Sequence, residues 1–220
     1  MTVQLKIKRY VPITGVLVCK TGLRIGGSRE ELEIGGMDNP IIRDPVDGLP
    51  YIPGSSLKGK LRSILEYKYD KVGNQGNPCG CAQPLDTCPV CTIFGPHMRP
   101  THDLGPSRLI VRDAMLTQQS LDELSKLNKE GGLQYAEVKT ENIIDRRTGI
   151  ARERGLRTQE RVPKGTSFNF NLSLRVFESD DEAKMVNYVR EALELLVSDY
   201  LGGSGTRGYG WVEIRDLVVG

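Results

Sequence analysis

Apolar residues fall at β-strand spacing in five stretches of the chain, at residues 11–20, 108–116, 135–139, 167–176 and 211–214. Residues 167–176 alternate cleanly, with phenylalanine, leucine and valine on one face and serine, asparagine and arginine on the other. One-sided strands of this kind belong to an antiparallel sheet. The β-branched run at 11–20 predicts a buried first strand with Cys19 as a core thiol, and residues 108–116 predict a second central strand.

Three further stretches have the spacing of amphipathic helices, at residues 56–70, 120–131 and 180–201. In the first, Leu57, Leu61 and Leu65 recur on one face. Ser55 or Ser56 is placed to cap this helix. In the last, valines and leucines form a long apolar stripe, and acidic residues occupy the first turn, where the helix dipole favours them.

The order of these elements is strand, helix, strand, then strand, helix, strand, with long insertions. This order predicts an α+β fold with a ferredoxin-like βαββαβ core, the RRM-like layout of RNA-recognition domains, in a single domain over residues 1–220. Only 6% of the residues are aromatic, so we expect contacts with the backbone and shape of RNA rather than with base identity.

Composition limits the choice of environment and partner. The 220 residues, of which 38% are hydrophobic and 26% charged, suffice for one good core. No apolar run approaches the length of a membrane span, and the first ten residues lack the apolar segment of a signal peptide, so we expect a cytoplasmic protein with no membrane partner. The formal net charge is only +2, so any RNA surface must come from local clusters of cations.

In residues 74–106 the apolar positions follow neither the spacing of a β-strand nor that of an α-helix. We therefore expect something other than a hydrophobic core to hold this insertion. Its four cysteines follow the pattern C-x-C, six residues, C-x-x-C, and are Cys79, Cys81, Cys88 and Cys91. Four thiolates so close together predict one tetrahedral ion, most simply structural zinc in a knuckle. Four protein ligands leave no open position for water, so this metal is expected to fold the insertion rather than to catalyse. An iron–sulfur cluster, or a ligand from His97 or His102, is the alternative.

The stretch from Ile34 to Arg62 joins an irregular loop rich in glycine and proline to the start of the first helix. Free N–H groups after a Gly-Ser-Ser turn, the positive end of a helix dipole and nearby cations together predict a seat for phosphate. The residues that form it are Ser55, Ser56, Lys58, Lys60 and Arg62. An ordinary capped surface helix with solvated lysines is the alternative.

Residues 142–165 hold a basic patch, with seven cations against three acids. The cations are Arg146, Arg147, Arg152, Arg154, Arg157, Arg161 and Lys164. We interpret the segment as part of a projecting β-hairpin over residues 135–165, whose arginines contact phosphates and whose apolar residues wedge between bases. The candidate wedges are Ile143, Ile144, Ile150 and Leu156. A solvated, salt-bridged loop is the alternative.

Five glycines in nine residues follow the last predicted helix, at residues 202–210. Glycines let a backbone approach a ligand closely. We therefore expect phosphate or RNA backbone to contact Gly203 and Gly205, with Arg207 adding charge. A flexible turn is the alternative.

Several strings in the chain resemble one family. TGLRIGGS at residues 21–28 is followed by IGGMDNPIIRDP and LPYIPGSSLKGKLRS, and then by SRLIVRDAML, AEVKTENIIDRRTG and DYLGGSGTRGYGWV. In this order they resemble the backbone subunits of the Csm complex, the type III-A CRISPR interference particle, which belong to the RAMP superfamily of RNA-binding proteins. The resemblance covers nearly the whole chain, and several ordered motifs are far more specific than any one.

The resemblance implies partners for this chain. Copies of such a subunit stack into a filament along the guide RNA, in a complex with other Csm subunits that include the large polymerase-like subunit. A thumb hairpin from each copy, here residues 135–165, kinks the duplex of guide and target RNA at regular intervals. The TGLRIGGS string also places Arg24 among the residues expected to contact RNA.

The resemblance further implies that the subunit is a metal-dependent endoribonuclease, which cuts target RNA at each kink with Mg²⁺ or another divalent ion. The essential aspartate of the family lies after the glycine motif, and by motif match it is Asp38. Its carboxylate would hold the ion or accept a proton when a 2′-OH attacks the adjacent phosphate, giving a 2′,3′-cyclic phosphate and a 5′-OH end. Residue type alone does not separate Asp38 from Asp44 and Asp47, which can hydrogen-bond their own turns.

Three other functions share part of this pattern. A non-catalytic RNA-binding scaffold of a type III-A or III-B complex would keep every feature except the dependence on Asp38. A guide-processing endonuclease would want a histidine for acid–base work, and both histidines lie beside the cysteines. A zinc-ribbon interaction module without an RNA role would leave the basic patch and the glycine-rich segment unexplained.

Overall fold

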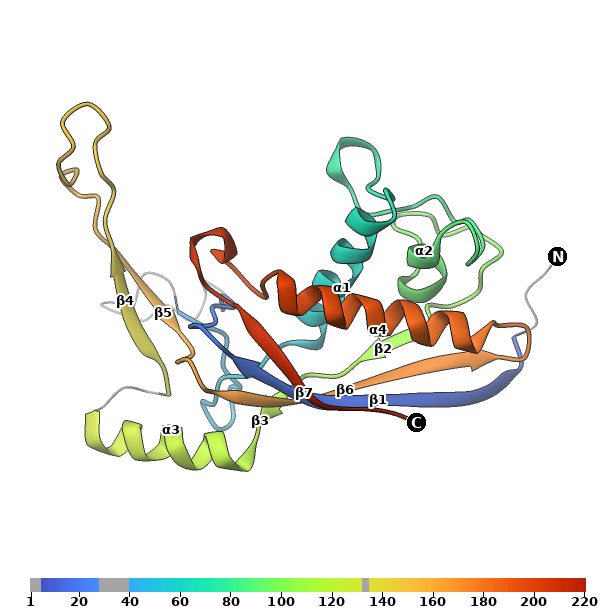
Figure 1. Cartoon of the computed structure of the whole chain (residues 1–220), viewed down its shortest axis with the longest axis horizontal. Coiled ribbons are helices and arrows are strands. Elements are labelled where there is room, and N and C mark those ends of the chain that lie inside the picture. The colour runs from blue at the N-terminus through green and yellow to red at the C-terminus, as the bar shows by residue number, and fades with distance from the viewer. Residues whose placement is uncertain (1–4, 28–39, 132–134) are drawn as a thin grey trace.

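The computed structural model describes residues 5–27, 40–131 and 135–220 (Figure 1). The strands are β1 (Ile7–Cys19), β2 (Leu109–Val111), β3 (Met115–Leu116), β4 (Glu137–Glu141), β5 (Arg157–Arg161), β6 (Ser167–Phe177) and β7 (Val212–Val219). The helices are α1 (Gly54–Lys68), α2 (Pro89–Phe94), α3 (Gln118–Gly131) and α4 (Glu182–Ser198), with 3₁₀ turns η2 (Asn74–Gly76) and η3 (Gly205–Arg207). Within the described ranges, no helix has both the length and the apolar character needed to cross a membrane.

The fold is mixed α/β, and its main sheet is antiparallel with the strand order β2-β6-β1-β7. β1 lies between β6 and β7, and its inward apolar residues are buried from Val11 onward; Val11, opposite Leu174 on β6, is 0% exposed. At Gly15 a β-carbon would lie 2.8 Å from the ring of Phe170, so only glycine leaves room for that ring. The predicted buried first strand and the one-sided strand that pairs with it are both confirmed.

Helices α1 and α4 pack against each other and cover one face of the main sheet (Figure 1). Each presents the apolar stripe that its sequence predicts: Leu57 and Leu61 on α1, and Val189 and Leu193 on α4, are at most 1% exposed. Burial of each such side chain stabilises the fold by about 1.5–3 kcal/mol. The core therefore lies between this helical layer and the sheet.

The insertion at residues 74–106 is part of the core, which corrects the expectation that something other than a core holds it. Val90 and Ile93 on α2 are 0% exposed and belong to the same hydrophobic cluster as the buried residues of α1 and α4. α2 is six residues long, too short for a helical period to be recognised in the sequence.

Residues 108–116 form two short strands rather than one central strand, which is a second correction. β2 is the edge strand of the main sheet, and β3 pairs separately with β6. Between them the chain turns so that the Asp113 carboxylate accepts a hydrogen bond from the Gly54 N–H group at 2.6 Å. Ala114 then pairs with Ile52. The contact with the start of α1 thus interrupts a stretch that looks continuous in the sequence.

The predicted cap of α1 by Ser55 or Ser56 is wrong. The helix begins at Gly54 with Pro53 at the N-cap position, and no side chain of the N-cap residue accepts a hydrogen bond. Both serines lie in the first turn, two and three positions after the N-cap residue, and so too late to cap. The carboxylate of Asp113 takes the first free N–H group instead.

β4 and β5 form a separate two-stranded antiparallel sheet that projects from the body of the protein (Figure 1). We call residues 135–165 the basic arm, its paired strands the stem and residues 142–156 the tip. At the tip, Gly149 N–H donates to the Asp145 carbonyl at 2.9 Å, and the Asp145 carboxylate accepts the N–H of Arg147 at 2.8 Å. The tip is therefore an ordered turn.

Arg108 is a buried cation, 1% exposed, that joins the insertion to the start of α4. Its guanidinium donates to both carboxylate oxygens of Asp180 at 2.9 Å and to the carbonyls of Leu104 and Pro106 at 2.6 Å. It also lies over the ring of Phe177, 4.6 Å from the centroid. A cation held away from water requires all of these partners.

Asp180→Ala is expected to destabilise the protein by about 3–5 kcal/mol, because it leaves the buried Arg108 charge without its carboxylate. The free energy of unfolding from urea titration measures the loss. Glu182→Gln, which breaks the exposed ion pair with Arg9, is the control and should leave the midpoint almost unchanged. Equal losses in the two variants would show that Arg108 does not depend on its partner.

Candidate metal centre and nucleic-acid interface

The four cysteines of the insertion converge on one point, with all four Sγ atoms within 4.8 Å of one another. The Sγ–Sγ distances are 3.8 Å for Cys79 and Cys88, 3.7 Å for Cys81 and Cys91, and 3.6 Å for Cys79 and Cys91. A tetrahedral ion with metal–sulfur bonds of about 2.3 Å has sulfur–sulfur edges of about 3.8 Å. The donor set therefore fits a metal such as zinc.

Without a cation the thiols share protons unequally. Hydrogen bonding from Cys91 lowers the pKa of Cys88 to about 5, whereas burial raises the pKa of Cys79 to about 11. The pKa of Cys91 is also raised, first by its hydrogen bond to Cys88. Four thiolates cannot coexist at these separations without positive charge between them, so metal binding must release protons.

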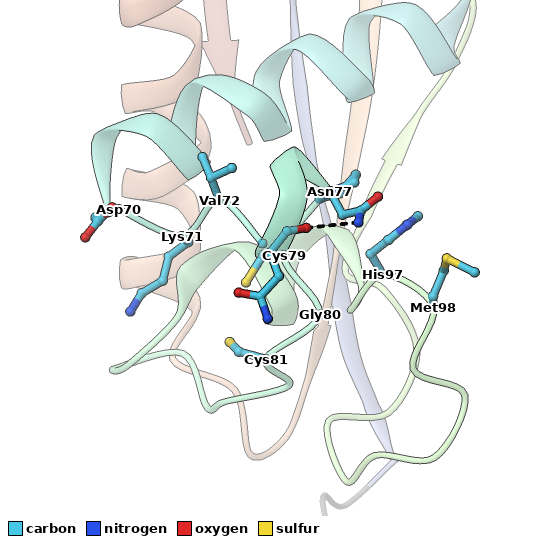
Figure 2. A pocket seen from close by; sticks show the side chains of 12 residues that line it. Asp70, Lys71, Val72, Asn77, Cys79, Gly80, Cys81, His97 and Met98 are labelled. Atoms are coloured by element: carbon cyan, nitrogen blue, oxygen red, sulfur yellow. Dashed lines mark hydrogen bonds between the residues drawn. The ribbon is translucent and has the colours of Figure 1, made fainter.

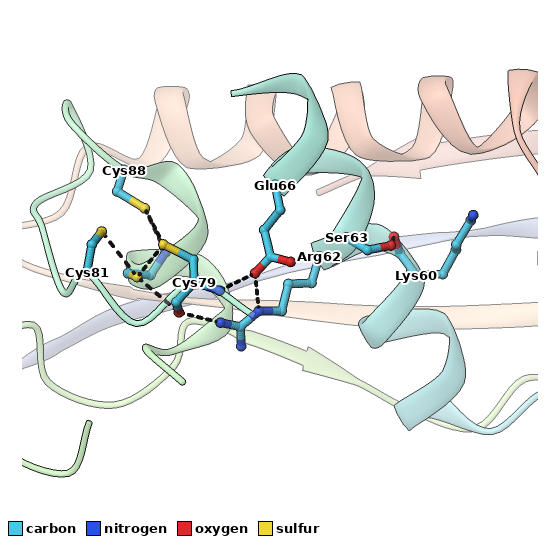
Figure 3. A network of polar contacts seen from close by, with 8 residues as sticks. Lys60, Arg62, Ser63, Glu66, Cys79, Cys81 and Cys88 are labelled. Carbon is cyan, nitrogen blue, oxygen red and sulfur yellow. Dashed lines mark hydrogen bonds and ion pairs between the residues drawn. The ribbon is translucent and has the colours of Figure 1, made fainter. Parts of the chain in front are cut away.

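A polar network joins this cluster to α1 (Figure 3). Glu66, 6% exposed, accepts hydrogen bonds from Arg62 Nε at 2.8 Å and from the Cys79 N–H at 2.7 Å. Arg62 Nη2 in turn donates to the Cys79 carbonyl at 2.7 Å. The backbone of the first ligand is thus fixed on the helix, as ligands of a structural metal usually are.

Neither histidine belongs to the group of metal-ligand atoms that the described residues bring together. The backbone N–H of His97 donates to the Cys79 carbonyl at 2.9 Å, and the ring atom Nδ1 of His102 accepts the backbone N–H of Leu104 at 3.2 Å. His97 and Cys81 instead line an open pocket of about 530 Å³ beside the cluster (Figure 2). A histidine ligand therefore has no support from the geometry.

The tip of the basic arm carries the exposed cations. Side chains of Arg146, Arg147, Arg152 and Arg154 are exposed, and no hydrogen bond or ion pair to them is found in the part of the chain that the structure describes. Ile150 and Leu156 are 68% and 64% exposed beside them. Apolar side chains held in water next to unpaired arginines favour a surface for a polyanion with stackable bases.

At the stem, several charges are paired around Glu141 of β4. Tyr209, 1% exposed, donates its hydroxyl to Glu141 at 2.6 Å, and Arg207 and Lys139 form ion pairs with the same carboxylate at 3.3 and 3.2 Å. The Tyr209 hydroxyl lowers the pKa of Glu141, and burial together with this bond raises the pKa of Tyr209 to about 12. Arg207 therefore joins the glycine-rich segment to the arm.

The glycines at residues 202–210 make room for other parts of the chain. A β-carbon on Gly202, where φ is +76°, would lie 2.3 Å from the Arg24 carbonyl, and one on Gly205 would lie 1.9 Å from the ring of Tyr200. Gly203 N–H donates to the Arg24 carbonyl at 2.8 Å. The structure thus brings Arg24, Gly203, Gly205 and Arg207 together beside the stem of the arm.

The cations at the start of α1 have partners inside the protein. Lys58 Nζ donates to Ser107 Oγ at 3.1 Å and to the Leu109 carbonyl at 2.9 Å, and burial lowers its pKa. Lys60 pairs with Asp199 at 2.8 Å and lies 3.8 Å from the centroid of the Tyr200 ring. These lysines and Arg62 are thus not the free cations that the sequence suggested.

A pocket of about 430 Å³ opens at the same end of α1, lined in part by Ser55, Lys58 and Arg175. Ser55 is exposed and Ser56 partly exposed there. Because the carboxylate of Asp113 already binds the first N–H group of the helix, a phosphate would share this helix end with a negative charge.

Asp38 lies outside the described residues. Asp44 and Asp47 are described, and each closes its own turn: Asp44 accepts the N–H of Val46 at 2.8 Å, and Asp47 accepts the N–H of Leu49 at 2.9 Å.

Sequence reasoning missed Glu160, a buried carboxylate of β5 whose partners lie 117 and 119 positions away. No local pattern marks it, because it stands among the cations of the arm.

Comparison with known proteins gives consistent matches along the chain. The profile of the RAMP superfamily matches residues 16–213. The protein named CRISPR system Cms endoribonuclease Csm3 from Methanothermobacter thermautotrophicus is 45% identical, over 96% of this chain and 86% of the relative. The protein of the same name from Methanocaldococcus jannaschii is 41% identical, over 97% of this chain and 82% of the relative.

Solved structures agree with these matches. Csm3 of Methanopyrus kandleri has a TM-score of 0.63 at 26% identity, covering 97% of this chain and 78% of that one. A chain of the crystal structure of a Csm3–Csm4 subcomplex of the type III-A CRISPR-Cas interference complex has a TM-score of 0.61 at 30% identity, covering 98% of this chain and 80% of that one.

Cys88→Ser is expected to abolish stoichiometric metal binding and to lower stability by several kcal/mol, because a tetrahedral site loses one of its thiolates. Metal content by atomic spectroscopy and urea titration measure both effects. Cys19→Ala is the control: Cys19 is a core thiol whose pKa burial raises to about 12, and its removal should leave metal content unchanged. Full metal content in Cys88→Ser would contradict the assignment.

Proposed function

Because the chain belongs to the RAMP superfamily and, within it, to the Csm3 endoribonucleases, we propose that it is the RNA-cleaving backbone subunit of a type III-A CRISPR complex. The observation that carries this proposal is 45% identity to a Csm3 endoribonuclease over 96% of the chain. The exposed, unpaired arginines at the tip of the basic arm give a physical reason for RNA binding in a protein of nearly neutral net charge.

The core is best assigned as ferredoxin-like, with a βαββαβ order made by β1, α1, β2, β6, α4 and β7. The strand order β2-β6-β1-β7 and the two helices on one face support this assignment. The basic arm between α3 and β6 and the cysteine-bearing segment between α1 and β2 are then insertions into one RNA-recognition layout. Structural zinc is the ion that the closed cysteine cluster suits best.

The basic arm is proposed to lie across the duplex of guide and target RNA. Its arginines neutralise phosphates, and Ile150 or Leu156 inserts between bases and unstacks one step. Base pairing between guide and target determines which RNA sequence is bound, while the protein recognises the geometry of the duplex. Copies of the subunit would repeat this contact along a filament that also holds other Csm subunits, including the polymerase-like one, in the cytoplasm.

The proposed cleavage uses the 2′-OH of a nucleotide freed at the kink. Its oxygen forms a bond to the adjacent phosphorus, the bond from phosphorus to the 5′-oxygen breaks, and the products are a 2′,3′-cyclic phosphate and a 5′-OH end. Asp38 takes the proton from the 2′-OH, and water supplies the proton that the departing 5′-oxygen gains; alternatively, the Asp38 carboxylate would hold the divalent ion. Mg²⁺, when bound, would stabilise the charge that develops on the phosphoryl oxygens.

Asp38→Ala is expected to lower the rate of target cleavage by about a hundredfold or more in the reconstituted complex with Mg²⁺, since it removes a group that acts on the reacting atoms. Guide and target binding should persist. Single-turnover cleavage and filter binding measure the two properties. Asp47→Ala, which removes only a turn contact, is the matched control and should cut normally.

Binding without cleavage in both wild type and Asp38→Ala would identify a scaffold instead and would move the search for the nuclease to other subunits. Wild-type cleavage by Asp38→Ala would leave the nuclease function in place but assign the reaction to another residue.

Arg152→Ala is expected to weaken RNA binding by the complex at low salt and to lower the slope of log K against log[salt] by about one, because one phosphate contact is lost. Affinity measured from 50 to about 300 mM salt gives the slope. Lys184→Ala, which removes an exposed cation of α4 paired with Asp86, should leave the slope unchanged. An unchanged slope in Arg152→Ala would place the RNA away from the arm.

A further inference from the structure

Glu160 is the least expected charge in the stem of the basic arm. It lies on β5, opposite Val138 of β4, and is 8% exposed although it carries a charge. A carboxylate held away from water must be paired, or it raises the free energy of the fold by several kcal/mol. Its partners therefore indicate what the residue is for.

Both partners of Glu160 belong to one distant segment, residues 40–50. One carboxylate oxygen accepts the N–H of Ile41 at 2.9 Å, and the other forms an ion pair with Arg43. Arg43 also donates to the carbonyl of Gly48 at 3.2 Å, and Ile41 is 2% exposed. One strand of the arm thus fixes both the backbone and a side chain of this segment.

The segment that Glu160 holds begins just after Asp38 in the chain: Ile41 follows Asp38 by three positions. The described residues on either side of positions 28–39 are also paired with each other, since Gly27 N–H donates to the Pro40 carbonyl at 3.2 Å and Ile42 N–H donates to the Ile25 carbonyl at 2.8 Å. The end of the stem joins the same assembly, because Val162 exchanges two backbone hydrogen bonds with Leu23 at 2.8 and 3.0 Å.

We propose that Glu160 is a positioning residue for RNA cleavage, which ties residues 41–43, a few positions after Asp38 in the chain, to the arm that bends the target. The proposal rests on the nuclease function proposed above. It adds that bending and cutting are coupled through one buried carboxylate, because Glu160 joins the arm to the residues that follow Asp38 in the chain. A displacement of about 1 Å at a reacting group can cost about a hundredfold in rate.

Glu160 touches neither RNA nor the reacting atoms in this proposal, so its removal has a distinct signature. Glu160→Ala is expected to slow single-turnover cleavage about tenfold to a hundredfold at saturating target, with target affinity within about twofold of wild type. The cuts should also spread to phosphates next to the normal sites, because residues 41–43 are no longer tied to the arm. Loss of stability alone would not broaden the cut sites of the complexes that assemble.

Glu160→Gln and Arg43→Gln separate the two contacts. Glutamine at position 160 keeps an acceptor for the Ile41 N–H but loses the ion pair, so an intermediate loss of rate is expected. Arg43→Gln removes the same ion pair from the other side, and the double variant should be no slower than either single variant, as coupled residues require. These variants keep the proposal testable if Glu160→Ala does not assemble.

Glu137→Gln is the matched control. Glu137 lies in the same stem, on β4, and pairs with Arg161 inside the hairpin rather than with residues 40–43. It should cut at the wild-type rate and at the wild-type sites, which would show that the effect does not come from any lost charge in the stem.

The experiment compares these variants with wild type and Asp38→Ala in the reconstituted complex, with cuts mapped at nucleotide resolution. Slow, spread cutting with normal target binding in the Glu160 variants supports the proposal. Wild-type rates at the wild-type sites, or a loss of target binding that accounts for the loss of cutting, would overturn it. Failure of wild type to cut at all would instead reject the nuclease function itself, so the two failures are distinguishable.

Discussion

The antiparallel pairing of β1 with β6 is the interaction on which the rest of the structure depends. These are the two longest strands, and together they carry most of the inward apolar face of the sheet. α1 follows β1 and α4 follows β6, so the ladder decides where both helices can bury their stripes. The basic arm leads directly into β6 through Gly165, whose N–H group donates to the Cys19 carbonyl at the end of β1. The root of the arm is thus fixed to the rigid part of the fold.

Three buried ion pairs connect long insertions to that frame, and each has a backbone group as an additional partner. Arg108 and Asp180 join the insertion to α4, Arg62 and Glu66 join Cys79 to α1, and Arg43 and Glu160 join the arm to residues 40–50. Buried pairs contribute little net stability compared with apolar residues, but breaking one is costly. In this protein the ion pairs fix the positions of the insertions relative to the sheet and helices. Fixed positions are what segments that bind RNA in a defined geometry require.

The candidate site divides into parts that local sequence reveals and parts that it conceals. The four cysteine ligands lie within thirteen residues, so their spacing alone predicts a shared ion, and the structure brings their sulfurs within 4.8 Å. The exposed arginines of the arm were also recognisable, because a hairpin tip has no core to enter. By contrast, Lys58 and Arg207 look like free cations in the sequence but are paired, since their partners come from other elements.

The sequence by itself determined the main strands and helices β1, α1, β6, α4 and β7, their inward faces and the convergence of the four cysteines, because each depends on residues a few positions apart. Only the tertiary structure decided that the glycines after α4 admit the chain's own backbone, that Asp113 occupies the start of α1, and that residues 108–116 break in two. It also decided the partners of Glu160, which lie 117 and 119 positions away. The physical reason is that burial and ion pairing depend on contacts between residues far apart in the sequence. Local periodicity carries no information about such contacts.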